Sequence, residues 1–202
     1  MKPTLLVATT NSGKFSEIDN FFGDKFNLIS MNDKNIDPCD EPHDTFVENA
    51  LLKARYVSKI INLPVLADDS GLVVDVLKGN PGVKSARFSK STQGLTRDEA
   101  NNLKLLECMS SFDDLKQRQA HFVSVVVGIS HYLDPFPAIG IGTWHGQILT
   151  NLNGDGGHGY DPLFYCPIAK KTAAEMSLDE KQKYSHRGQS LKNIFPFLIE
   201  KF

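Results

Sequence analysis

The sequence has few cysteines and lacks any apolar run long enough to cross a membrane. Its 202 residues include three cysteines, Cys39, Cys108 and Cys166, which lie far apart and form no CxxC pair. This excludes a disulfide framework and a cysteine zinc site, and it fits a reducing compartment. The longest apolar run, Phe122–Ile129, is far shorter than the roughly 20 residues that a membrane helix needs. We therefore expect a cytoplasmic protein with no membrane partner.

Net charge of either sign is also nearly absent. Lysine and arginine together number 22, aspartate and glutamate number 24, and the formal net charge is −2 at pH 7. Binding nucleic acid through counterion release needs a strongly basic face, and binding an anionic membrane needs a basic patch. The charge balance therefore argues against nucleic acid as a partner and disfavours a nucleic-acid-binding module.

What the sequence does contain is typical of a soluble globular protein, because 41% of the residues are hydrophobic and 23% are charged. The length predicts a single domain over residues 1–202, or two lobes that share one core. Segments with the periodicity of strands and of helices alternate along the chain. This alternation predicts an α/β fold with a central sheet and helices on its faces.

Apolar runs with β character predict strands at Thr4–Ala8, Phe26–Ser30, Val65–Ala67, Leu72–Leu77, Phe122–Ile129, Ala138–Thr143 and Trp144–Leu149. Apolar residues at steps of three or four predict helices over 15–22, 45–62, 96–109, 177–183 and 190–200. Three of these helices begin with the spacing of a capping box, at Thr45/Glu48, Thr96/Glu99 and Ser177/Glu180. The run at 122–129 is almost wholly apolar, which predicts a central strand covered on both faces.

A polar turn, Thr9-Thr10-Asn11-Ser12-Gly13-Lys14, joins the first predicted strand to the first predicted helix. A helix N-terminus presents free N–H groups and partial positive charge, and hydroxyl, amide and lysine side chains add donors. The turn is therefore a candidate phosphate site, although the Walker A pattern GxxxxGK[ST] is absent. An ordinary strand–helix connection is the alternative interpretation.

Asp68 and Asp69 directly follow an apolar strand, and Glu41 lies upstream in a polar loop. Adjacent carboxylates at a strand end are costly to hold without a cation, because like charges disfavour joint ionisation. Mg²⁺ binds through one or two carboxylates plus substrate phosphates, and one carboxylate could also orient or deprotonate an attacking water. The alternative is a turn with two solvated aspartates.

Thr45, Asn49 and Lys53 are spaced i, i+4 and i+8 on the predicted long helix, so they share one face beside the loop that carries Glu41. Lys53 on this face could meet a phosphate. The alternative is the solvated face of an amphipathic helix.

Two further segments carry groups suited to a nucleoside. The glycine-rich loop Gly154–Pro162 includes His158 and Tyr160, whose rings could stack on a nucleobase. His186 and Arg187 stand side by side between two predicted helices and could contact carbonyl oxygens or phosphate. A flexible surface loop and a polar helix–helix turn are the respective alternatives.

In their order along the chain, these motifs resemble the inosine/xanthosine triphosphate pyrophosphatase family. The resemblance is carried by TTNSGK, DEP…TFVENALLKAR, LADDSGL, PGVKSARF, GYDP and TAAEMSLDEKQKYSHRGQSLK, and it covers about residues 5 to 195. It implies an elongated α/β fold with a central mixed sheet, two lobes with a cleft between them, and a homodimer. It also implies Mg²⁺-dependent hydrolysis of non-canonical purine nucleoside triphosphates (ITP, dITP and XTP) to the monophosphate and pyrophosphate, which removes deaminated purines from the nucleotide pool.

The resemblance implies roles for individual residues as well. Asp69 matches the family's general base and, with Glu41, its metal-associated carboxylates, while Asp68 is implied as a helper. The residues implied to bind substrate are Thr9, Thr10, Asn11, Ser12, Gly13, Lys14, Lys53, Ser70, His158, Gly159, Tyr160, Asp161, Lys181, His186 and Arg187. Arg87 matches an arginine near the substrate cleft.

One position departs from the family pattern, because His158 stands where the family usually has phenylalanine before GYD. Imidazole stacks on a purine with less area than a phenyl ring, and its edge is titratable. Two alternative functions stay open. One is a pyrophosphatase of the same architecture that acts on pyrimidine or modified nucleotides, as in the septum-associated nucleotide pyrophosphatase group. The other is a nucleotide-binding sensor without turnover, against which the acidic set argues, since a sensor needs no water-activating carboxylate.

Overall fold

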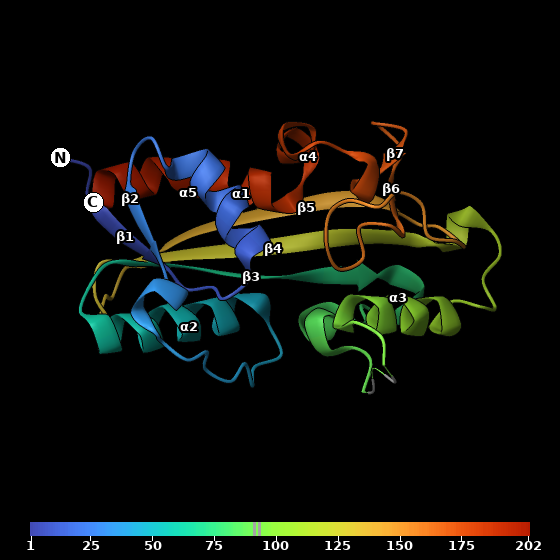
Figure 1. Cartoon of the computed structure of the whole chain (residues 1–202), viewed down its shortest axis with the longest axis horizontal. Coiled ribbons are helices and arrows are strands. Elements are labelled where there is room, and N and C mark those ends of the chain that lie inside the picture. The colour runs from blue at the N-terminus through green and yellow to red at the C-terminus, as the bar shows by residue number, and fades with distance from the viewer. Residues whose placement is uncertain (91, 93) are drawn as a thin grey trace. The chain divides into compact units, whose positions relative to one another are not determined.

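Within residues 1–90, 92 and 94–202, which the computed structural model describes, the chain forms a seven-stranded sheet (Figure 1). The strand order is β2-β1-β3-β4-β5-β6-β7. The bounds are β1 Thr4–Val7, β2 Asn27–Ser30, β3 Val65–Val74, β4 Gln119–Ile129, β5 Ala138–Ile148, β6 Phe164–Cys166 and β7 Lys171–Thr172. β1 pairs in parallel with β2 and β3, whereas β6 pairs antiparallel with β5 and β7, so the sheet is mixed.

Helices flank this sheet, which confirms the predicted α/β class (Figure 1). Their bounds are α1 Ser12–Phe22, α2 Phe46–Ile61, α3 Arg97–Cys108, α4 Leu178–Tyr184 and α5 His186–Lys201. The apolar run at 122–129 lies in β4, the fourth of the seven strands, as predicted for a central strand. In the part of the chain that the structure describes, no helix is both long and apolar enough to cross a bilayer.

The chain divides into two compact units. Unit 1 comprises Met1–Asp69, Ser124–Gly142 and His186–Phe202, and unit 2 comprises Ser70–Val123 and Thr143–Ser185. In unit 1, α1 and α5 lie on one face of the strands and α2 lies on the other (Figure 1). The unit 1 core is formed by apolar side chains of β1, α1 and α5, including Leu5, Ile18, Phe22, Leu191 and Leu198. The unit 2 core includes Leu72, Leu105, Phe122, Trp144, Tyr160 and Phe164.

Two strands are longer than the sequence predicted. β3 runs unbroken through Asp68, Asp69 and Ser70, where the pattern indicated two apolar runs separated by a polar turn. β5 runs unbroken from Ala138 to Ile148, where two strands were predicted. The prediction that the two aspartates lie at a strand end is therefore wrong, since both lie inside β3 and are buried. Ion pairs with side chains from other elements make this burial possible.

α5 begins at His186 and not at the predicted Ser190, so the supposed polar turn is the first turn of a helix. Close packing of α5 on β5 requires glycine in the strand. A Cβ on Gly142 would lie 2.0 Å from the His186 carbonyl oxygen, and a Cβ on Gly140 would lie 2.3 Å from the Ser190 carbonyl oxygen. The close approach of α5 buries His186 and Arg187.

Each predicted capping box marks the start of a helix. Thr96 and Glu99 make both reciprocal bonds at the start of α3. At α2 and α4 the N-cap hydroxyl accepts the expected backbone N–H. Glu180 of α4 pairs with Lys171 at 2.8 Å instead of completing its box. The capping spacing therefore locates helix starts even where the second bond is replaced by a tertiary contact.

Candidate active site

The polar turn before α1 is ordered by its own side chains. Asn11 is the N-cap of α1, and its side-chain oxygen accepts the Lys14 N–H at 3.0 Å. The Thr9 hydroxyl oxygen accepts the Asn11 N–H at 3.2 Å. Thr10, Asn11 and Ser12 are exposed, so the turn presents a helix N-terminus to solvent. This is the feature that suits the turn to phosphate.

Asp68 on β3 lies in a dense set of partners within unit 1. Its Oδ2 is 2.7 Å from Lys14 Nζ and 3.4 Å from Arg187 Nη2, and its Oδ1 accepts the Ser124 hydroxyl at 2.8 Å. Burial alone would raise the pKa of Asp68, but Arg187 and Lys14 outweigh burial and hold that pKa well below its usual range. Burial lowers the pKa of Lys14, and Asp68 opposes that effect. Asp68 is therefore an ionised counter-ion to two cations.

Asp69, the next residue on β3, has different partners, because successive side chains of a strand point to opposite faces. Lys53 of α2 bridges Asp69 to Glu41, since its Nζ lies 3.1 Å from Asp69 Oδ1 and 2.7 Å from Glu41 Oε1. Burial raises the pKa of Asp69 against the opposing effect of Lys53. Burial also opposes charge on Lys53, but Asp69 and Glu41 raise its pKa above the usual value. The fold thus brings together three candidate residues that are far apart in the sequence.

The residues at this bridge fit a divalent cation. Asp69 Oδ2 is buried and has no hydrogen-bond partner among the described residues. A buried carboxylate oxygen of this kind is costly unless a cation or donor meets it. The described residues hold no group of three or more His, Cys, Asp or Glu side chains that could bind a metal alone. A metal on Glu41 and Asp69 would complete its shell with water and substrate oxygens, which is usual for Mg²⁺.

The other two residues of the α2 stripe have structural contacts. Thr45 is the N-cap of α2, and its hydroxyl oxygen accepts the Glu48 N–H. Asn49 is buried and bonds to the backbone of His43 through both amide atoms, at 3.0 and 3.1 Å. The two bonds from Asn49 hold the end of the loop that carries Glu41. Lys53 pairs with the Glu41 carboxylate itself.

Sequence reasoning missed three polar residues of unit 1: Glu17, Ser124 and Ser190. Glu17 is buried on α1 and accepts a hydrogen bond from Arg187 Nη1, and the hydroxyl oxygens of Ser124 and Ser190 lie 2.8 Å apart. Burial alone would lower the pKa of Arg187, but Asp68 and Glu17 raise it. Glu17 could have been found in the sequence as an acid one turn after Lys14 on a helix with an apolar face. Ser124 could have been found as the one hydroxyl side chain in the apolar run at 122–129.

In unit 2, Asp161 organises the glycine-rich loop. Its Oδ2 accepts the His158 N–H at 2.8 Å and the Lys181 ammonium at 2.6 Å. Tyr160 is buried in the unit 2 core and donates its hydroxyl to the Ser85 carbonyl oxygen at 2.8 Å. This burial corrects the expectation that the Tyr160 ring is available for stacking on a base. His158, two residues earlier in the same loop, is half-buried.

The remaining candidates in unit 2 are Ser70, Arg87 and Gly159. Ser70 follows the aspartates on β3 and is half-buried, and Arg87 ends a 3₁₀ helix, Gly82–Arg87, and is exposed. Gly159 lines a cavity of about 370 Å³ together with its neighbour His158 and with Asp98 and Asn102 of α3.

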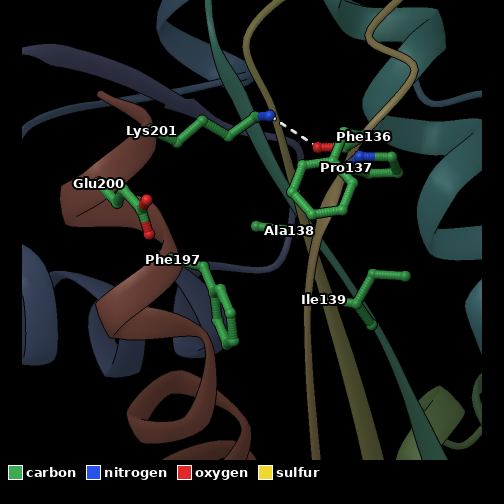
Figure 2. Close-up of a pocket in the computed structure, with 7 residues that line it drawn as sticks. All are labelled: Phe136, Pro137, Ala138, Ile139, Phe197, Glu200 and Lys201. Carbon is green, nitrogen blue, oxygen red and sulfur yellow. Dashed lines mark hydrogen bonds between the residues drawn. The ribbon is translucent and has the colours of Figure 1, made fainter.

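A separate cavity of about 260 Å³ in unit 1 is unsuited to a triphosphate (Figure 2). Its lining is mostly apolar and consists of Phe136, Pro137, Ala138, Ile139, Phe197, Glu200 and Lys201. Lys201 donates to the Phe136 carbonyl oxygen at 2.7 Å and pairs with Asp134 at 2.8 Å. Its charge is therefore already neutralised.

With this geometry in place, comparison with known proteins decides the family. A family model described as the Ham1 family matches residues 5–197. The chain belongs to the Ham1 family. A curated dITP/XTP pyrophosphatase from Nitrosomonas europaea is 42% identical over 197 residues, 97% of this chain and 94% of that protein. Another from Escherichia coli K12 is 45% identical over 195 residues, 96% of this chain and 97% of that protein.

Solved structures of Ham1 proteins share the fold. The HAM1 protein from Coxiella burnetii has a TM-score of 0.87 at 38% identity, covering 98% of this chain and 99% of that one. The Staphylococcus aureus Ham1 protein has a TM-score of 0.83 at 34% identity, covering 98% and 100%. The family inferred from the motifs is thereby confirmed, and so is the enzyme class, a nucleoside-triphosphate pyrophosphatase.

Proposed function

We propose that this protein hydrolyses dITP, ITP and XTP, with Mg²⁺, to the nucleoside monophosphate and pyrophosphate, and so removes deaminated purines from the nucleotide pool. The observation that carries the proposal is the bridge of Lys53 to Glu41 and Asp69, with Asp69 Oδ2 buried and without a partner in the described chain. The names of the Ham1 relatives, dITP/XTP pyrophosphatases, support this substrate class.

Lys14, Lys53 and the N-terminus of α1 supply the positive charge for a triphosphate. Both lysines are paired with carboxylates in the structure, so their charges are balanced before substrate binds. When a triphosphate and a divalent cation bind, the phosphates would pair with the lysines and the cation would pair with the carboxylates. Glu41 and Asp69 would hold the divalent cation, and Lys53 would then be able to contact phosphate.

Asp69 is the residue that activates water in this proposal. Bound Mg²⁺ supplies Lewis acidity at the phosphate oxygens. Asp69 orients a water toward the α-phosphorus and accepts its proton as the new P–O bond forms. The bond from the α-phosphorus to the α–β bridging oxygen breaks, and its electron pair leaves with pyrophosphate, whose charge Lys14 and Lys53 stabilise. The raised pKa of Asp69 suits a general base, since proton transfer is most effective when that pKa is nearer the working pH.

The nucleoside end of the substrate is assigned to the glycine-rich loop of unit 2, where His158 and Gly159 contact it, and to Lys181, whose ammonium carries more donors than its bond to Asp161 uses. A 6-keto purine offers an acceptor where adenine offers a donor, so donors favour hypoxanthine and xanthine. Each donor left unpaired when adenine binds costs about 1–3 kcal/mol. Selectivity against adenine therefore follows from hydrogen bonding alone.

We also propose that the protein is a cytoplasmic homodimer, as the resemblance implies. All three cysteines are free, which is consistent with a reducing compartment. Sedimentation equilibrium measures the assembly directly, and a monomer mass at assay concentration would contradict the dimer.

Pyrophosphate release from ITP, XTP, GTP and ATP, assayed side by side with Mg²⁺ and with EDTA, tests the function. We expect ITP and XTP to exceed ATP at least about tenfold in kcat/KM, because one unpaired donor is worth about 1.4 kcal/mol or more. We also expect EDTA to abolish release. Faster cleavage of pyrimidine or modified triphosphates would favour the alternative pyrophosphatase, and binding without pyrophosphate release would indicate a sensor.

A further inference from the structure

The glycine-rich loop of unit 2 is attached to α3 through one residue, Gly159. Its N–H donates to Asp98 Oδ2 at 2.7 Å, and its carbonyl oxygen accepts from Asn102 Nδ2 at 2.8 Å. Gly159 has φ +63°, in the left-handed region that glycine adopts freely along with many other conformations. Two bonds from one helix therefore hold a residue that would otherwise be among the most flexible in the loop.

The position of Asp98 and Asn102 on α3 lets both side chains bond to the same peptide. Asp98 and Asn102 are one turn apart, so their side chains lie on the same face of α3. Asn102 is only 5% exposed, and the bond from Gly159 to the Asp98 carboxylate is charge-assisted. The complete capping box of Thr96 and Glu99 fixes the start of the helix just before these residues.

The same helix also holds the segment that precedes it. The Asn101 side chain accepts the Ser89 N–H at 2.8 Å and donates to the Ala86 carbonyl oxygen at 3.2 Å. Arg97 donates to the Ser89 carbonyl oxygen at 3.0 Å. α3 thus sets the place of the residues on either side of Arg87 as well as the place of Gly159.

A cavity lies between part of this face of α3 and the loop. The cavity of about 370 Å³ is lined by both, with Leu95 and Leu103 on the helix side and Leu152 and Pro162 on the loop side. Deeper in unit 2, Leu105 of α3 and Tyr160 of the loop belong to one buried apolar cluster. At the edge of the cavity, where the described side chains of the two segments do not pack on each other, the hydrogen bonds to Gly159 set their spacing.

We propose that Asp98 and Asn102 are positioning residues that set base selectivity by holding the Gly159 peptide and, with it, the adjacent His158 ring. The inference rests on the proposed function, in which His158 and Gly159 contact the nucleoside. Neither α3 residue touches the substrate in this scheme. Their loss therefore weakens nucleoside recognition while the metal and phosphate groups of unit 1 keep their arrangement.

Two substitutions test the proposal. Asp98→Ala removes the acceptor for the Gly159 N–H. Asn102→Leu removes the donor to its carbonyl oxygen and also an Asn102 Oδ1 that is buried without a partner among the described residues, so folding should be little affected. For each we expect KM for ITP and the inhibition constant of inosine monophosphate to rise about five- to tenfold. The ITP to ATP preference should fall by a similar factor, with kcat and the inhibition constant of pyrophosphate within about twofold of wild type.

A matched control separates positioning from helix stability. Thr96→Ala removes the N-cap of α3 but leaves both bonds to Gly159, so it should lower thermal stability without changing the ITP to ATP preference. Asp98→Asn keeps an acceptor oxygen and should therefore keep an ITP to ATP preference near that of wild type, in contrast to Asp98→Ala. Unchanged selectivity in Asp98→Ala and Asn102→Leu, or an equal loss in Thr96→Ala, would overturn the proposal. A wild-type protein that cleaves no purine triphosphate would instead overturn the proposed function, and this inference with it.

Discussion

Asp68 and Asp69 are adjacent in sequence but differ in chemistry. The alternation of a strand turns Asp68 toward Lys14 of α1 and Arg187 of α5, and it turns Asp69 toward Lys53 of α2. In unit 1, α1 and α5 lie on one face of the strands and α2 on the other (Figure 1). The pKa of Asp68 is lowered, whereas that of Asp69 is raised. A pair of like residues thus supplies one structural counter-ion and one candidate base.

Replacing Asp69 by asparagine should abolish turnover without unfolding the protein. Asparagine has nearly the same shape but cannot accept the proton of the attacking water, so we expect kcat for ITP to fall at least about 100-fold. Lys53 keeps its partner Glu41 at 2.7 Å, and burial disfavours the Asp69 charge, so the melting temperature should stay equal or rise. Steady-state pyrophosphate release and thermal unfolding measure the two effects.

The neighbouring substitution Asp68→Asn is the matched control. It leaves the buried Arg187 and Lys14 without their shared carboxylate, and breaking a buried ion pair costs about 3–5 kcal/mol. We expect this variant to lose stability far more than Asp69→Asn does. If Asp69→Asn turns over ITP at the wild-type rate, Asp69 is not the general base, even if Asp68→Asn proves far less stable than Asp69→Asn.

At the scale of elements, local sequence signals located most of the fold. The three capping spacings each mark a helix start. The almost wholly apolar run at 122–129 gave the central strand β4. These features depend on residues a few positions apart, which a sequence displays directly.

The elements that sequence reasoning misjudged depend on distant residues. Asp68 and Asp69 look like a turn because nothing nearby shows the cations of α1, α2 and α5 that let them lie inside β3. The first turn of α5 looks like a polar linker because its burial requires Gly142 of β5 to let the helix backbone approach. β6 and β7 cover three and two residues, too few for a pattern to form. Glu17 was missed because its partner, Arg187, lies near the other end of the chain.

At the scale of the whole molecule, stability in acid depends on carboxylates whose pKa is lowered by folding. Asp134 follows β4, and its carboxylate accepts the Ser130 N–H at 2.8 Å, the Phe136 N–H at 3.0 Å and Lys201 of α5 at 2.8 Å. Burial alone would raise the pKa of Asp134, but the bonds from Lys201, Ser130 and Phe136 lower it below its ordinary value of 3.8. One carboxylate thereby joins the β4–β5 connection to the last turn of the chain.

Asp134→Asn should therefore lower the free energy of unfolding at neutral pH, and the difference from wild type should be smaller in acid. We expect the free energy of unfolding to fall by about 2 kcal/mol at pH 7. Because the folded pKa lies below the unfolded one, the unfolded chain binds more protons between them, and the stabilisation is lost as pH falls through that window. The gap to wild type should narrow by about 1 kcal/mol at pH 3, measured by urea unfolding. Asp24→Asn changes the same charge at an exposed aspartate that pairs with Lys25, so an equal pH dependence there, or a constant gap for Asp134→Asn, would refute the linkage.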